Sequence, residues 1–197
     1  MREEVLRELN KLAESISYKL QRMEDLISKN NIKEEEIPLF RFPRKVIREA
    51  HKYKEEIKFI DDEIIKSNIA YTWMVTDVYR WLITRTDIDF AAKSLLIKQW
   101  IIATASIIEA IVTYIASQIT KREIKSVNTA VKILFQSNII KEEDMKALKD
   151  IWGQRNKIHI GNIKEKEYAK YSENDYLKAI QTLQTLINRL NKVHYKG

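Results

Sequence analysis

Glycine, proline and cysteine are scarce or absent in this chain of 197 residues, which has three glycines, two prolines and no cysteine. An all-β protein needs frequent turns, and the residues that make those turns are largely missing. Without cysteine, the chain has no disulfide, no cysteine-ligated zinc site and no cysteine nucleophile. The composition therefore predicts an all-α fold built from long helices.

Long apolar runs are also scarce, and the segment closest to a membrane span is 100–116. It is shorter than the roughly 20 mostly apolar residues that cross a bilayer, and it contains polar residues, including Glu109. The first residues, MREEVLRELNKL, carry charge from the second position and include no apolar signal region. We interpret 100–116 as a buried central helix and expect a cytoplasmic protein that contacts no membrane.

Several signatures of catalysis and cofactor binding are missing. The sequence has no glycine-rich phosphate loop, no nucleophile elbow and no HExxH zinc motif. Its three histidines, His51, His159 and His194, are too scattered for an obvious metal cluster. We interpret the acidic run Asp61-Asp62-Glu63 as a solvated helix face, and we expect neither a metal nor a cofactor.

Charge of one sign is in excess only in the second half of the chain. Residues 1–109 carry 19 basic and 19 acidic side chains, whereas residues 110–197 carry 16 and 9, which accounts for the net charge of +7. A local basic excess suits a polyanion such as RNA, and a solvated lysine-rich surface is the alternative. The residues predicted to contact RNA are Lys121, Arg122, Lys125, Lys157 and Lys164.

Helical periodicity begins at the start of the chain. Over 2–29 the apolar residues follow one another at steps of 4, 3, 4, 4, 3 and 4, on one stripe of a helix: Val5, Leu9, Leu12, Ile16, Leu20, Met23 and Ile27. This predicts a long amphipathic helix, which either packs on the rest of the chain or binds a protein partner through a coiled-coil-like seam. Residues 30–43 contain both prolines and a charge run, and form the predicted linker.

Periodicity resumes at residue 44 and predicts a helical segment over 44–85, with a possible break near Ser67. We therefore divide the chain into an N-terminal helical extension, 1–85, and a helical bundle, 86–197. Within the bundle we expect a central helix capped by Asp87 or Asp89, two shorter helices at about 124–135 and 141–160, and a last helix capped by Ser172.

One segment within the bundle has an unusual pattern. When 141–160 is projected as a helix, Arg155 and His159 fall on the apolar face with Leu148, and Asn156 lies at its edge. An arginine on a buried face needs a partner, and Glu109 is the candidate carboxylate. The alternative is chemical: arginine binds a phosphodiester, and histidine takes or gives a proton near neutral pH.

These residues resemble the motif of a known protein family. The stretch IIKEEDMKALKDIWGQRNKIHIG (139–161) resembles the motif helix of HEPN-superfamily proteins, in which an Arg is followed by Asn, Asp or His and then by a His. The earlier apolar helix with an embedded glutamate (ASIIEAI, 105–111) and the tyrosine-rich loop at 168–176 are similar too. Active members usually have four to six residues between Arg and His, and this chain has three.

The resemblance implies an up-and-down helical bundle that dimerises through its motif helices, here 141–160. Many members are metal-independent endoribonucleases of toxin–antitoxin, phage-defence and CRISPR-linked systems, and others only bind RNA or partner proteins. By position, the resemblance implies a site formed by Arg155, Asn156, His159 and Glu109. Two interpretations stay open: an RNA-binding protein with endoribonuclease activity, and a non-catalytic dimerisation or adaptor module.

Overall fold

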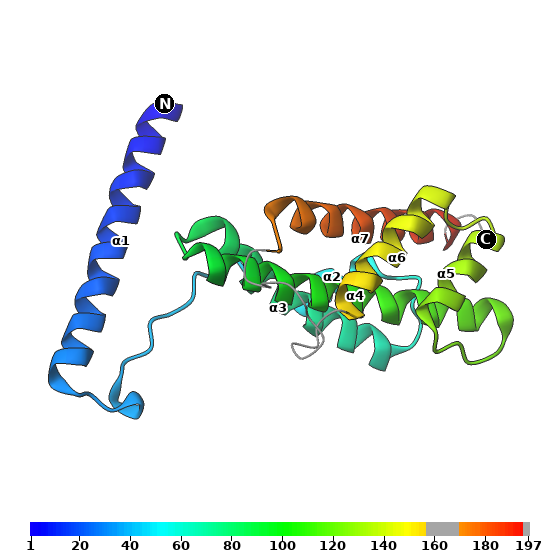
Figure 1. Cartoon of the computed structure of the whole chain (residues 1–197), viewed down its shortest axis with the longest axis horizontal. Coiled ribbons are helices and arrows are strands. Elements are labelled where there is room, and N and C mark those ends of the chain that lie inside the picture. Colours follow the sequence, from blue (N-terminus) through cyan, green and yellow to red (C-terminus); the bar gives the residue numbers. More distant parts are fainter. Residues whose placement is uncertain (157–169, 195–197) are drawn as a thin grey trace. The chain divides into compact units, whose positions relative to one another are not determined.

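The structure, a computed structural model, describes residues 1–156 and 170–194 (Figure 1). Every regular element in these ranges is helical, which confirms the predicted all-α fold. The elements are α1 (Arg2–Asn30), a 3-10 turn η1 (Glu34–Glu36), α2 (Ala50–Glu56), α3 (Glu63–Arg85), α4 (Phe90–Thr120), α5 (Val127–Gln136), α6 (Glu142–Asn156) and α7 (Glu173–His194).

The chain forms two compact units, 1–43 and 44–197. The first unit contains α1, η1 and the proline-containing linker. Helix α1 ends where Asn31 adopts a left-handed conformation, with φ 48°, and donates its backbone N–H to the carbonyl of Ile27. This confirms the predicted helix over 2–29, and no residue of α1 is buried.

The second unit is organised around α4. This helix packs against α3, α5, α6 and α7, while α2 packs on α3. By length and composition α4 could cross a membrane, but 56% of its most apolar stretch is buried inside the protein. The predicted central helix is therefore confirmed, and the bundle surrounds it. Its buried apolar side chains are Ile97, Trp100, Ile101, Ala105, Ile107, Ile108, Ile111, Val112 and Ala116.

Capping side chains set where three helices begin. Asp89 accepts a hydrogen bond from the backbone N–H of Ala91 at the start of α4, at 2.9 Å. At the start of α7 the backbone N–H of Ser172 donates to Asp175 at 2.9 Å, and the N–H of Asp175 points back to the Ser172 hydroxyl at 3.4 Å. Asp62 is exposed and caps α3, so part of the acidic run has a local structural role. The caps predicted for α4 and α7 are confirmed.

The segment 44–85 differs from its prediction. The helix starts at Ala50 instead of residue 44, and it is interrupted at 57–62 instead of near Ser67. Helical periodicity could not predict this interruption, because Ile57 and Ile60 are fully buried although they are not helical. The compact units divide between residues 43 and 44, whereas the sequence suggested 85 and 86, because α3 packs along α4.

Candidate functional site

Helices α6 and α4 bring Arg155 and Glu109 together. The Nη2 atom of Arg155 lies 3.9 Å from Oε2 of Glu109, and both side chains are 34% exposed. The guanidinium carbon of Arg155 lies 4.6 Å from the centre of the Trp152 ring. The partner predicted for Arg155 is therefore present. The pair is half-buried, however, and not enclosed in the core as an apolar-face position suggested.

The packing of α6 fixes this arrangement. Leu148 and Ile151 of α6 are buried, and the helix packs against α4, α5 and α7. At the other end of α6, Asp144 accepts hydrogen bonds from the backbone N–H of Lys141 at 2.9 Å and from Nε of Arg189 in α7 at 3.1 Å. Helix α6 is therefore anchored at its N-terminus and presents Arg155 near its described C-terminal end.

The guanidinium of Arg155 contacts Glu109, Trp152 and Asn156, but within the described part of the chain its donors are not all used. Nη1 donates to Oδ1 of the neighbouring Asn156 at 3.4 Å, and the distance of 3.9 Å to Glu109 exceeds that of a hydrogen bond. Within the described residues, the buried Nε of Arg155 has no hydrogen-bond partner. A guanidinium carries five N–H donors, so the contacts to Asn156 and Glu109 do not saturate Arg155 within the described part of the chain.

The other predicted site residues fall into two groups. His159, Lys157 and Lys164 lie outside the described residues. Lys121 and Arg122 are exposed in the connection between α4 and α5, where Lys121 has a left-handed backbone with φ 55°.

Lys125 lies in the same connection and lines an open groove of about 580 Å³ together with Glu109. Two further carboxylates, Asp62 and Glu123, also line this groove, and Glu123 pairs with Lys125 at 3.3 Å. With three carboxylates against one ammonium group, the groove itself is unfavourable for phosphates. The connection carrying Lys121 and Arg122 is the better candidate for contact with a polyanion.

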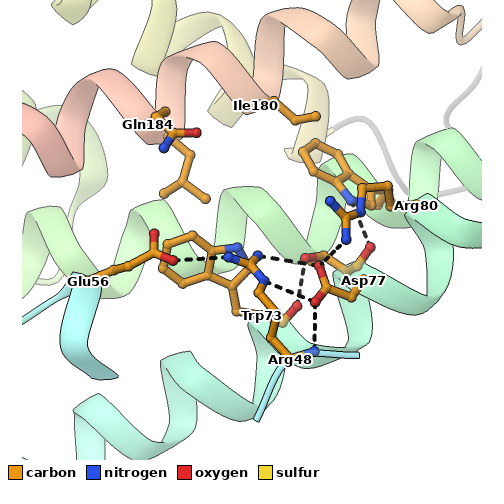
Figure 2. Close-up of a pocket in the computed structure, with 10 residues that line it drawn as sticks. Arg48, Glu56, Trp73, Asp77, Arg80, Ile180 and Gln184 are labelled. Carbon is orange, nitrogen blue, oxygen red and sulfur yellow. Dashed lines mark hydrogen bonds and ion pairs between the residues drawn. The ribbon is translucent and has the colours of Figure 1, made fainter. Parts of the chain in front are cut away.

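A second arginine–carboxylate cluster was missed by the sequence analysis (Figure 2). Asp77 of α3, whose side chain is 3% exposed, accepts hydrogen bonds from the backbone N–H and the Nε of Arg48, at 3.1 and 3.2 Å. The Tyr53 hydroxyl donates to the same carboxylate oxygen. Nη2 of Arg80 lies 3.3 Å from the other oxygen. Asp77 is therefore fully satisfied by three residues.

This cluster lines a cavity of about 280 Å³ whose walls include Trp73 and Trp100. Arg48 lies 4.3 Å from the centre of the Tyr53 ring and donates to Glu56 at 3.0 Å. Two arginines and two carboxylates therefore cancel in charge, and their hydrogen bonds join the 44–49 segment and α2 to α3. We interpret this cluster as structural.

The same contacts shift two ionisation equilibria. Burial by itself would raise the pKa of Asp77, but the hydrogen bonds from Arg48 and Tyr53 outweigh it and hold the pKa of that carboxyl below its usual range. Burial, together with the hydrogen bond to Asp77, raises the pKa of Tyr53 well above that of an exposed tyrosine. Each shift favours the protonation state that the hydrogen bonds require.

One signal could have revealed Asp77. It is an isolated acid within an aromatic stretch, YTWMVTDVYRW, as Glu109 is within an apolar one. Its main partner, Arg48, lies 29 residues earlier in a segment without regular structure, so helical spacing could not connect the two.

Among the described residues, no group of three or more histidines and carboxylates is arranged to hold a metal ion. The chain matches no family model, no curated protein and no solved structure.

Proposed function

We propose that this chain is a HEPN-like RNA-binding protein and that its Arg155 site cleaves RNA in a homodimer. One observation supports this function above the others: the arginine of the motif and the glutamate of the preceding apolar helix lie 3.9 Å apart at a half-exposed position. The resemblance assigns both residues to one site. Within the described residues, Nε of Arg155 also has no hydrogen-bond partner, whereas Nε of the structural Arg48 donates to Asp77.

In the proposed reaction the 2′-hydroxyl of the RNA attacks the adjacent phosphorus. A bond forms between the 2′-oxygen and phosphorus, the bond to the 5′-oxygen breaks, and a 2′,3′-cyclic phosphate and a free 5′-hydroxyl result. Arg155 binds the phosphate and stabilises its developing negative charge. His159 transfers a proton as general base or acid, and Asn156 orients Arg155, to which it is hydrogen-bonded. None of these steps uses a metal.

RNA affinity is proposed to come from phosphate contacts with the basic residues of the second half, beginning with Lys121 and Arg122. Each such contact releases counterions, so binding should weaken steeply as salt rises. The homodimer through 141–160 is part of the same proposal, since the resemblance pairs two motif helices.

The test is cleavage of single-stranded RNA in the presence of EDTA, followed on a gel. We expect the wild type to cleave, and His159→Ala and Arg155→Ala to lose about 10²- to 10⁴-fold in rate, as is typical for acid–base and phosphate-binding groups. Arg85→Ala is the matched control, because Arg85 is an exposed arginine in the last turn of α3, outside the site. Circular dichroism establishes that each variant is folded.

The outcomes separate the enzyme from a binding module. A wild type that leaves a panel of RNAs intact in EDTA, while binding them with a steep salt dependence, contradicts the cleavage step alone. Binding that is absent at low salt contradicts the whole RNA proposal.

The second candidate function is a non-catalytic dimerisation or adaptor module. It is favoured by the charge balance at Glu109, which already offsets Arg155 and faces a groove rich in carboxylates. In that case Arg155 positions α6 on α4 and has no role in RNA chemistry. The prediction specific to this module is a stable dimer by light scattering with no affinity for RNA.

A further inference from the structure

The apolar stripe of α1, defined as Val5, Leu9, Leu12, Ile16, Leu20, Met23 and Ile27, has no buried member. Its first five residues are each between 40% and 56% exposed. Scattered apolar residues are normal on a surface, but a continuous exposed stripe marks an interaction site. The helix is uninterrupted over 29 residues and ends in a capped turn, so the stripe is presented as a single rigid face.

The spacing of the stripe fits a second helix lying along its whole length. The residue types repeat after eleven positions: Leu9 is followed by Leu20, and Ile16 by Ile27. Eleven residues make three turns at about 3.67 residues per turn, close to the natural value of the helix, so such a stripe runs nearly straight and supports a coiled coil. A heptad stripe drifts around the helix and needs supercoiling to stay in contact.

The charge of α1 indicates which partner covers the stripe. The helix carries six basic and six acidic side chains, with no net charge. Helices that bind membrane surfaces are rich in Lys and Arg on their polar face, and a polyanion would also need a basic excess. A neutral helix suits a partner that is neutral too, and α1 of a second copy is such a partner.

The charges that flank the stripe are self-complementary. At about 98° per residue for an eleven-residue repeat, Arg2 and Glu24 lie about 65° to one side of the stripe, and Glu8 and Lys19 the same angle to the other. When two copies pair antiparallel, edges of the same kind meet. Arg2 then faces Glu24 of the second copy, with residue numbers summing to 26, and Glu8 faces its Lys19, summing to 27.

The stripe itself pairs in the same register. Leu9 faces Ile16 of the second copy, with a sum of 25, and Val5 faces its Met23, with a sum of 28. These two sums, 25 and 28, lie on either side of the sums of 26 and 27 given by the charged pairs. One alignment therefore buries the stripe and joins opposite charges on both edges. We propose that α1 forms an antiparallel coiled coil with α1 of a second copy of this chain.

The absence of cysteine from the chain makes a site-specific test possible in the full-length protein. Ala13 lies on the same edge as Arg2 and Glu24, and in the proposed register it faces itself, since 13 and 13 sum to 26. Ala13→Cys should therefore form an intermolecular disulfide on mild oxidation, seen as a dimer on a non-reducing gel. Tyr18→Cys is the matched control, because Tyr18 is 67% exposed and lies on the opposite face.

Dimer formation by Ala13→Cys but not by Tyr18→Cys supports the proposal. Equal cross-linking of the two variants, or cross-linking of neither, overturns it. The readout is local to α1, so a separate contact between copies through α6 does not affect it.

A charge exchange supplies a second readout. Glu24→Arg should weaken dimerisation by about 2- to 30-fold at low salt, since two exposed pairs are lost, as measured by sedimentation equilibrium. Adding Arg2→Glu to the same chain restores the opposite charges and should return the dimer to its original affinity. A double variant that is weaker than Glu24→Arg alone would overturn the register.

Discussion

The two arginine–carboxylate clusters of the second unit use the same chemistry in opposite ways. At Asp77 the carboxylate is almost fully buried and accepts hydrogen bonds from Arg48 and Tyr53 while pairing with Arg80. At Glu109 the pair is one-third exposed, the contact to Arg155 is long, and a buried donor of that arginine has no partner within the described residues.

The difference lies in what each cluster joins. Arg48 connects the segment 44–49, which contains no helix, to α3. Arg155 lies on a regular helix that Leu148 and Ile151 already pack against the bundle. The network at Asp77 is therefore the main polar link of its segment, whereas the contact of Arg155 with Glu109 adds to a helix that is already packed.

The largest expected effect is at the saturated cluster. Asp77→Asn should destabilise the protein by about 3–5 kcal/mol, because it removes the buried carboxylate, 3% exposed, that pairs with both Arg48 and Arg80. Urea denaturation at pH 7 measures the loss. Because the pKa of Asp77 is lowered in the folded state, its contribution is complete above the ordinary aspartate pKa and is lost as the pH falls through the lower folded value. The difference from the wild type should therefore shrink below about pH 4.

An intermediate effect is expected from the hydroxyl in the same cluster. Tyr53→Phe should cost about 1.5–3 kcal/mol at pH 7, the usual value for a hydrogen bond to a charged group. Since the folded pKa of Tyr53 is raised, this contribution is complete below the unfolded pKa of about 10 and is lost as the pH rises above it. Denaturation at pH 7, 9 and 10.5 tests the sign: a gap between the two proteins that widened at high pH would contradict it.

The smallest effect is expected at the open cluster. Glu109→Gln and Arg155→Met should each change stability by less than about 1 kcal/mol, because the pair is one-third exposed and its contact is weakened by solvent. Thermal unfolding monitored by circular dichroism compares them directly with Asp77→Asn. If either variant destabilised the protein as much as Asp77→Asn does, Arg155 would be a structural arginine and the contrast between the clusters would disappear.

The helices and one of the two arginine–carboxylate clusters could be predicted from the sequence. Helix α4 was recognisable because it is apolar on nearly every face, and its start was set by Asp89, a capping residue just before an apolar run. The proximity of Glu109 and Arg155 was predicted because each is an isolated charge on an apolar helix face.

The features that the sequence did not predict depend on contacts that produce no helical periodicity. The chain between α2 and α3 is not helical, but its apolar residues are buried at spacings that continue the helical pattern. Periodicity alone therefore predicted a helix there. Arg48 has no regular structure around it, and its partner Asp77 is distant in sequence. The exposure of Arg155 was predicted wrongly. A helical projection shows which face of α6 carries a residue, but it does not show whether that residue lies in the middle of the packed interface or at its edge.

The central position of α4 has a consequence for how the protein is made on the ribosome. One side of α4 is covered by α7, and the hydrogen bond from the backbone N–H of Tyr171 to the Ser94 hydroxyl spans 77 residues of sequence. At a synthesis rate of roughly 5–20 residues per second, those residues take on the order of 4–15 seconds to appear. During that interval the nascent chain carries a 31-residue apolar helix that lacks its last covering layer, so this face of α4 stays exposed to solvent until α7 has been synthesised.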